Sequence, residues 1–224
     1  MHYFATQKAF DERTRICYAV TKELIAMFKA VFFDFDGVLT TDKYGSVSIA
    51  KFLAGKTGLP ADRIRAAYQK HNGGLLRGAI DHGQMWDAFC TDLGVQMPIS
   101  WLTEAAQATP LDPQMLGLVR ELHDRGVITG MITDNPASRV EEIVQLHGLR
   151  EWFDVISVSG AIGSRKDQPE IFEHALQSAS LPAPDCIFID NTAANLIIPA
   201  QLGMKTHFFD DEKRDMIALR NALA

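Results

Sequence analysis

The sequence predicts an α/β protein, a doubly wound parallel sheet with a small helical domain inserted after its first strand. Short apolar runs that resemble buried strands occupy residues 29–34, 127–133, 155–158, 186–190 and 204–209. Strands buried on both faces read as continuous apolar runs of this kind. Helical patterns separate the last four runs, so the chain alternates strand with helix, which is the order of a doubly wound sheet.

Prolines and glycines mark where the helices between these strands begin and end. Asp112-Pro113 supplies a capping side chain and a first-turn proline, and Gly126 is placed to end the same helix. Pro136 and Gly148 bound the next helix in the same way. These signals leave each of the later strands flanked by helices.

Residues 46–111 interrupt the alternation, because they contain helical patterns and no convincing strand. An insert at this position follows the carboxyl end of the first strand, where α/β sheets bind ligands. We therefore expect a helical cap above the site. The predicted division is an N-terminal extension with helical periodicity at 1–26, a core at 27–45 and 112–224, and the cap at 46–111.

The composition narrows the class of protein. The 224 residues carry a formal net charge of −6 and are 47% hydrophobic, so they can bury a large core. The acidic balance argues against nucleic-acid binding, which needs a basic surface. No apolar run reaches the roughly 20 residues that cross a bilayer, and three widely spaced cysteines match no metal pattern. We expect a cytoplasmic protein that acts on a small molecule.

Polar residues stand at the carboxyl ends of four predicted strands. They are Asp34 with Asp36, Thr133, Lys166 in the loop after residues 155–158, and Asp190. The carboxyl ends of parallel strands lie side by side. These residues are therefore expected to meet in one crevice although they are far apart in sequence.

This set of side chains suits phosphoryl transfer. A carboxylate such as Asp34 can attack phosphorus and form an aspartyl-phosphate, and a lysine with a hard divalent cation neutralises the approaching anions. Asp36 would project to the same side of an extended chain and exchange protons with the leaving oxygen and the attacking water. Gly37 permits a tight turn that brings backbone amides to a phosphate.

Four segments in order resemble the motifs of the haloacid dehalogenase superfamily. They are Phe33-Asp34-Phe35-Asp36-Gly37-Val38-Leu39-Thr40, Ile132-Thr133, Lys166 with Pro169-Glu170-Ile171-Phe172, and Ile187-Phe188-Ile189-Asp190-Asn191. The resemblance covers roughly residues 28–210 and implies a Rossmann-like core with a helical cap in the first insertion position. The family's dehalogenases lack an acid two residues after the nucleophile, so Asp36 favours phosphate chemistry.

The resemblance implies a role for each matched residue. Asp34 would be the nucleophile and a ligand of Mg²⁺, and Asp36 would be the general acid and base with its carbonyl on the metal. Thr133 and Lys166 would bind the transferred group, and Asp190 would ligate Mg²⁺. The expected phosphate-binding residues are Phe35, Gly37, Thr133, Asp134 and Lys166.

The chain departs from the family's pattern at three positions. Asp134 stands where Asn is common, and its carboxylate would repel phosphate, so we expect only its backbone amide to contribute. Asp167 replaces the proline that commonly follows the lysine, which leaves Arg165 as an alternative to Lys166. Asn191 replaces a second acid, although its amide oxygen can still hold the metal or a metal-bound water.

The sequence of the cap indicates the substrate less clearly than the motifs of the core indicate the reaction. Arg77 is the cap residue expected to contact an anionic group of the substrate. We predict a magnesium-dependent phosphatase acting on a small phosphorylated metabolite. A phosphomutase of the same family, a phospho-acceptor signalling module and a catalytically silent relative are the alternatives. Asp36 and the cap argue against the signalling module, which has neither, and the intact acids and lysine argue against a silent relative.

Overall fold

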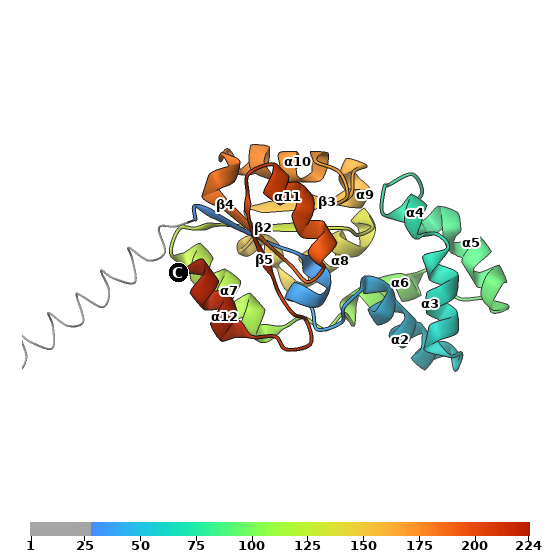
Figure 1. Ribbon diagram of the computed structural model, residues 1–224. Helices are drawn as coiled ribbons and strands as arrows, with labels where there is room; N and C mark the ends of the chain where they lie inside the picture. The colour runs from blue at the N-terminus through green and yellow to red at the C-terminus, as the bar shows by residue number, and fades with distance from the viewer. Residues whose placement is uncertain (1–27) are drawn as a thin grey trace, which may run out of the picture.

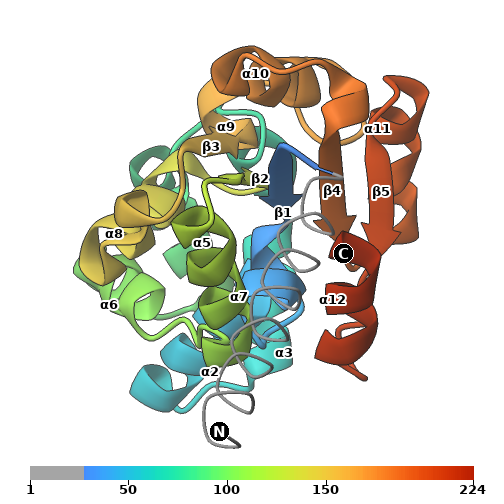
Figure 2. The same ribbon diagram turned by 90° about the vertical axis from the view of Figure 1, so that its left-hand side faces the viewer.

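A computed structural model describes residues 28–224, and the helical extension predicted at residues 1–26 lies outside them. Five parallel strands form one sheet in the order β3-β2-β1-β4-β5 (Figure 1). Figure 2 shows β3 and β5 toward its two edges. The strands are β1 (Ala30–Phe33), β2 (Ile128–Thr133), β3 (Val155–Val158), β4 (Cys186–Asp190) and β5 (Lys205–Phe208). The predicted fold class is confirmed.

Helices cover both faces of the sheet: α7 (Pro113–Asp124), α8 (Ala137–His147), α10 (Glu170–Ala179), α11 (Ile197–Gln201) and α12 (Met216–Leu223). Alternate residues of β1 belong to opposite faces. Val31 and Phe33 share an apolar cluster with α7, α8 and α12, whereas Ala30 and Phe32 share one with α10 and α11. Figure 1 shows α10 and α11 on one side of the sheet and α7 and α12 on the other. Burial on both sides explains why the strands are unbroken apolar runs.

Between β1 and α7 the chain forms five helices: α2 (Gly45–Thr57), α3 (Ala61–Gln69), α4 (Asn72–Leu75), α5 (His82–Leu93) and α6 (Ser100–Gln107). They have an apolar cluster of their own, in which Leu53, Ile64 and Phe89 are fully buried. Figure 1 shows this unit, here called the cap, to one side of the core. The segment Asn72-Gly73-Gly74 begins the short helix α4.

Shorter turns of helix complete the described part of the chain: Phe35–Leu39, Leu149–Glu151, α9 (Ser159–Ile162), Ala183–Asp185 and Ala193–Leu196. The first of them follows β1 directly and contains Asp36. Within residues 28–224 there is no helix with the length and apolar character needed to span a membrane.

The two segments that join cap and core run beside each other. Thr40 and Leu111 form an isolated antiparallel bridge, and the amide of Asp112 donates to the carbonyl of Leu39 at 2.9 Å. The cap therefore leaves and re-enters the core at one place, directly after the turn at Phe35–Leu39.

Arg214 ties the turn to the C-terminal part of the chain. Its guanidinium donates to the carbonyls of Gly37 and Val38, both at 2.8 Å. Its Nε donates to Asp112 at 2.8 Å, and Asp112 also caps the N-terminus of α7. One side chain thus fixes the turn against the start of the helix that follows the cap.

We expect Arg214→Ala to lower the free energy of unfolding by at least about 2 kcal/mol, because two carbonyls and a capping carboxylate lose a charged donor. Urea denaturation followed by circular dichroism measures this change. The matched control is Lys213→Ala, since that side chain is 79% exposed and its loss should cost less than about 0.5 kcal/mol. Equal unfolding midpoints for the two variants would contradict the prediction.

Candidate active site

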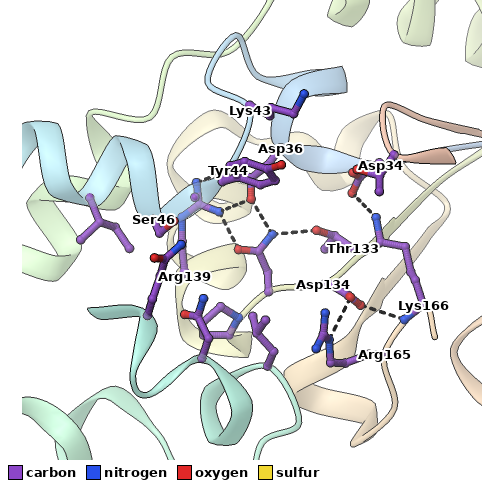
Figure 3. A pocket seen from close by; sticks show the side chains of 18 of the residues that line it. Asp34, Asp36, Lys43, Tyr44, Ser46, Thr133, Asp134, Arg139, Arg165 and Lys166 are labelled. Carbon is purple, nitrogen blue, oxygen red and sulfur yellow. Dashed lines mark hydrogen bonds and ion pairs between the residues drawn. The ribbon is translucent and has the colours of Figure 1, made fainter. Parts of the chain in front are cut away.

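A cavity of about 450 Å³ lies where the carboxyl ends of β1, β2 and β4 meet the cap. Residues of the core and of the cap line it together. Figure 3 shows Asp34, Asp36, Thr133 and Lys166 gathered around this space. The four residues predicted to be catalytic, which are spread over more than a hundred positions, therefore line one cavity.

The lysine predicted from the third motif lies between two carboxylates. Nζ of Lys166 is 2.6 Å from Asp34 Oδ1 and 2.7 Å from Asp190 Oδ2. Lys166 and Asp190 are essentially inaccessible, and Asp34 is nearly so. Asp190 also accepts from the amide of Thr192 at 2.7 Å and from the side chain of Asn195. One buried cation thus serves two buried anions, which leaves the cluster one positive charge short.

The shortage of positive charge affects the pKa values of the side chains in this cluster. Burial, and next the Asp190 carboxylate, raise the pKa of Asp34 well above its usual value, although Lys166 acts in the opposite direction. Burial also disfavours the charged amine, but Asp34, Asp190 and Asp134 together outweigh it and raise the pKa of Lys166. Lys166 is therefore a permanent cation at neutral pH. Full ionisation of Asp34 calls for more positive charge nearby.

The turn after β1 holds the nucleophile candidate in a defined orientation. Asp34 has an extended backbone with ψ 159°, and its Oδ1 accepts the amide of Phe35 at 2.7 Å. Within residues 28–224 its Oδ2 accepts no hydrogen bond. The amide of Gly37 donates to Thr40 Oγ1 at 3.0 Å, and Gly37 has a φ of 83°, which favours glycine.

The Phe35 and Gly37 amides, which we expect to donate to a phosphate, have other acceptors in this structure. Both amides already donate to side chains of their own turn. The reason is local, because the extended backbone of Asp34 folds its carboxylate over the next amide and the tight turn returns Thr40 to Gly37. A phosphate could take these donors only by replacing the two side chains.

Asp36 lies in a polar network that the motifs did not reveal. Arg139 donates to both of its oxygens at 2.9 Å, and Asn135 Nδ2 donates to Oδ2 at 2.9 Å. Asn135 Nδ2 also donates to Thr133 Oγ1 at 2.7 Å, which leaves the Thr133 hydroxyl proton free for another acceptor. Figure 3 shows this chain of contacts from Arg139 to Thr133. The network orients the general acid candidate and the hydroxyl together.

Arg139 also touches both connections between cap and core. A Cβ placed on Gly45, at the start of α2, would lie against its guanidinium. Its Nη2 reaches the hydroxyl of Thr109 at 3.4 Å on the returning segment. Sequence offered one signal for it, since a cation in the first turn of a helix is electrostatically unfavourable unless a carboxylate compensates. Only the structure shows that Asp36 is that carboxylate.

The departure at Asp134 has a structural role. Its Oδ1 accepts the amide of Lys166 at 2.9 Å, and its Oδ2 accepts Nε of Arg165 at 3.0 Å. The side chain therefore braces the loop that carries the lysine. The alternative in which Arg165 replaces Lys166 is disfavoured, because Arg165 faces Asp134 while Lys166 faces Asp34.

The residues expected to hold Mg²⁺ suit a hard cation. Asp34 and Asp190 supply two carboxylates that share one amine, and Asn191 and the carbonyl of Asp36 stand at the ends of the same strands. The described residues contain no group of three or more His, Cys, Asp or Glu placed to hold a metal. Mg²⁺ is commonly held by one or two carboxylates and several waters, so two are enough.

Asn191 adds an observation of its own. Its Nδ2 is buried and has no hydrogen-bond partner among residues 28–224, and a Cβ on Gly37 would collide with it. Asn191 also lines the cavity. An oxygen bound in the cavity, from a metal-bound water or a phosphoryl group, would satisfy this donor. The residues present therefore fit the predicted cofactor.

The cap is joined to the core by a buried hydrogen-bond chain. Tyr68 Oη lies 2.7 Å from His82 Nε2, and His82 Nδ1 lies 2.9 Å from Ser138 Oγ on α8. Burial, and next the charge of Arg139, lower the pKa of His82 to about 4. His82 is therefore neutral near pH 7, and each ring nitrogen has a hydroxyl partner.

Arg77, the predicted substrate contact, does not line the cavity. It pairs with Asp167 at 3.1 Å on the exposed boundary between cap and core. Asp167 replaces the proline that commonly follows the lysine of the third motif. This departure therefore supplies the carboxylate that holds Arg77 outside the cavity. Sequence could not show this, because the two positions are 90 residues apart.

Residues 28–203 match the family described as haloacid dehalogenase-like hydrolases. The chain belongs to this family. The match spans β1 through α11, which includes all the strand ends that form the cavity and the whole cap. The chain is therefore a hydrolase of the haloacid dehalogenase-like type, and the resemblance drawn from four motifs is confirmed.

Relatives within this family include phosphatases. Sesquiterpene phosphatase astK of Aspergillus oryzae is 32% identical over 109 residues, which are 49% of this chain and 56% of that protein. Glyceraldehyde 3-phosphate phosphatase of Pyrococcus furiosus is 27% identical over 200 residues, which cover 81% of this chain and 80% of that protein. The chain thus spans little more than half of the first relative's length.

Solved structures of the family share the fold. A haloacid dehalogenase family enzyme of Bacteroides thetaiotaomicron, crystallised with magnesium, superposes with a TM-score of 0.67 at 15% identity. The superposition covers 87% of this chain and 99% of that chain. At this identity the likeness shows the fold alone.

We expect Arg139→Met to lower the free energy of unfolding by about 3 kcal/mol, because it leaves the Asp36 carboxylate buried without its counter-ion. Asp36→Asn in the same chain should recover part of this loss, since a neutral amide needs no counter-ion. Urea denaturation of the two single variants and the double variant gives the coupling free energy, expected at about 1 to 3 kcal/mol.

Arg150→Met is the control for the Arg139 experiment. Arg150 pairs with Glu141, but both side chains are more than 60% exposed, so its loss should cost less than about 1 kcal/mol. If Arg139→Met is no more costly than Arg150→Met, or if the coupling free energy is near zero, the ion pair does not fix Asp36.

His82 gives an expectation for the dependence of stability on pH. A histidine whose pKa is lower in the folded state takes up protons first in the unfolded chain, so its contribution is complete above about pH 6.5 and is lost toward pH 4. The loss from this residue is on the order of 2 to 3 kcal/mol. Urea denaturation between pH 7 and pH 4 should show a shallower fall for His82→Gln than for the parent protein.

The control for the pH experiment is His123→Gln, which removes a half-buried histidine from the opposite part of the core. Its stability should follow the parent protein between pH 7 and pH 4. If His82→Gln has the same pH slope as the parent, the buried neutral histidine does not contribute as described.

Proposed function

We propose that this chain is a magnesium-dependent phosphatase that hydrolyses a small-molecule phosphate monoester through an aspartyl-phosphate on Asp34. The observation that carries the proposal is that two carboxylates line the same cavity and are held there by different partners. Asp34 is bound to a buried ammonium, whereas Asp36 is oriented by a guanidinium and an amide. One carboxylate is thus suited to attack, and the other to proton transfer.

In the first step an oxygen of Asp34 attacks phosphorus and the bond from phosphorus to the ester oxygen breaks. Oδ1 is held by Lys166 and by the amide of Phe35, so Oδ2 has its lone pairs available. Lys166 offsets the charge on the transferred group, and the Thr133 hydroxyl donates to one of its oxygens. Asp36 gives a proton to the departing alcohol.

In the second step water attacks the aspartyl-phosphate, and Asp36 takes a proton from that water. Phosphate leaves and Asp34 regains its carboxylate. Asp36 accepts hydrogen bonds from Arg139 and Asn135, so it must release one of these donors when it holds a proton. The cap segments beside Arg139 offer a way to couple that release to substrate entry.

Mg²⁺ bound at Asp34, Asp190, Asn191 and the Asp36 carbonyl would supply the positive charge that the buried cluster lacks. This charge would favour the ionised form of Asp34, whose pKa is raised by burial and by the Asp190 carboxylate. The other roles in the reaction belong to residues of the chain, which orient the reacting groups and exclude water beneath the cap.

Several observations favour a phosphatase over other members of the family. Dehalogenases share this fold, but here an acid stands two residues after the nucleophile and is held in the cavity. The relatives from Aspergillus oryzae and Pyrococcus furiosus, matched over 56% and 80% of their own length, are named phosphatases. A phosphomutase would use the same residues, and analysis of the product separates it from a phosphatase.

The proposal is tested with 4-nitrophenyl phosphate and a panel of phosphorylated metabolites. We expect phosphate release that requires added Mg²⁺ and stops with a chelator. Asp34→Asn should lower kcat by at least about a thousandfold, and Asp36→Asn by about a hundredfold or more. Both variants should keep a cooperative unfolding transition, so that loss of turnover is not loss of fold.

Asp92→Asn is the matched control, because it makes the same chemical change in an exposed cap pair with Lys70, and its kcat should be unaltered. Retained turnover in Asp34→Asn would remove Asp34 as the nucleophile. An isomerised sugar phosphate instead of free phosphate would identify a mutase.

A further inference from the structure

Five cationic side chains line the cavity: Lys43, Arg65, Arg139, Arg165 and Lys166. Four of them have a carboxylate partner within 3.1 Å. Arg65 differs, because no hydrogen bond or ion pair joins its side chain to any residue between 28 and 224. Within that range, the protein therefore presents one cation to the cavity whose charge is not already balanced by an acid.

Arg65 is held by packing instead of by charge. It lies on α3 in the cap, and its guanidinium carbon is 5.5 Å from the ring centre of Tyr44, within reach of a cation–π contact. Its Nε is buried and has no hydrogen-bond partner among the described residues. A buried donor of this kind costs about 1–3 kcal/mol until something satisfies it, so the side chain is poised for an acceptor.

The surroundings of Arg65 also suit an anion. The cavity-lining neighbours on this side of the cap are neutral, namely Tyr68, Gln69 and Asn72. The acids that line the cavity, Asp34, Asp36 and Asp134, all belong to the core and are each paired with another cation. In a protein of net charge −6, an anionic group that enters this side of the cavity is attracted chiefly by Arg65.

We infer that Arg65 binds a second anionic group of the substrate, a carboxylate or a second phosphate, while the ester phosphate sits at Asp34. This inference rests on the proposed function and narrows its substrate class to phosphate monoesters with a further oxyanion. The planar fork of a guanidinium fits either group through two parallel hydrogen bonds. Arg65, not Arg77, is the cap residue that selects the substrate.

The experiment compares three series of phosphate esters that share linkers of two to six carbons. The first series ends in a carboxylate, the second in a second phosphate and the third in a neutral hydroxyl. Release of phosphate gives kcat/KM for each compound with the parent protein, Arg65→Gln, Arg65→Lys and Lys70→Gln. Lys70→Gln is the control, since it removes a cation from an exposed position at the end of the same helix.

With the parent protein, at least one carboxylate or bisphosphate should exceed its hydroxyl counterpart in kcat/KM by about ten- to a hundredfold, the effect of a charged hydrogen bond. Arg65→Gln should remove this preference, so that the ratio of kcat/KM between the charged series and the hydroxyl series falls to about one. Arg65→Lys should restore part of it, because it keeps the charge without the fork. The preferred series tells whether the second group is a carboxylate or a phosphate.

The inference is overturned, with the phosphatase intact, if the parent protein hydrolyses all three series alike. It is also overturned if Arg65→Gln lowers all series equally, or if Lys70→Gln removes the preference as fully as Arg65→Gln does. Absence of turnover with every ester would instead overturn the proposed function, and the inference with it. Thermal unfolding of each variant guards against misfolding, and a soluble Arg65→Lys keeps the test valid if Arg65→Gln unfolds.

Discussion

The buried amine of Lys166, held between the carboxylates of Asp34 and Asp190, is the contact on which the rest of the site depends. Removal of ionised groups from water is costly, and only mutual attraction and further hydrogen bonds can offset that cost. The loop after β3 must therefore reach across β2 and β1 to the end of β4. Asp134 and Asn195 support this arrangement from outside, the first by fixing the loop and the second by donating to Asp190. The remaining deficit of one positive charge is what the proposed Mg²⁺ would make up.

A second constraint lies at the junction of cap and core. Arg139 contacts Asp36, the start of α2 and the returning segment at Thr109. Arg214 donates hydrogen bonds to carbonyls of the turn that contains Asp36. The turn that contains Asp36 is therefore fixed by two arginines from distant parts of the chain. Such a junction lets the position of the cap influence the acid, because any movement of Gly45 or Thr109 alters what surrounds Arg139.

The strands and the polar residues at their carboxyl ends were predictable because they depend on local pattern. A buried parallel strand must be apolar, and a polar residue at its carboxyl end must face the crevice, so Asp34, Thr133 and Asp190 could be found by position alone. Arg139 and Arg65 could not, since arginine on a helix is ordinarily a solvated residue. The position of Arg77 outside the cavity lining could not be predicted either, because nothing in the sequence indicates that Asp167 pairs with it.

The sequence by itself determined the sheet, the family and the set of side chains that can carry phosphoryl transfer, because periodicity and motif order are properties of neighbouring residues. Only the tertiary structure decided how the charges are shared. It placed one lysine between two acids, gave Asp36 a guanidinium partner, and left Arg65 as the cavity cation without a carboxylate partner in the described residues. Charge balance in a cavity is a sum over residues brought together from the whole chain. Electrostatic attraction depends on the distance between groups in space and not on their separation in sequence, so no sequence pattern records it.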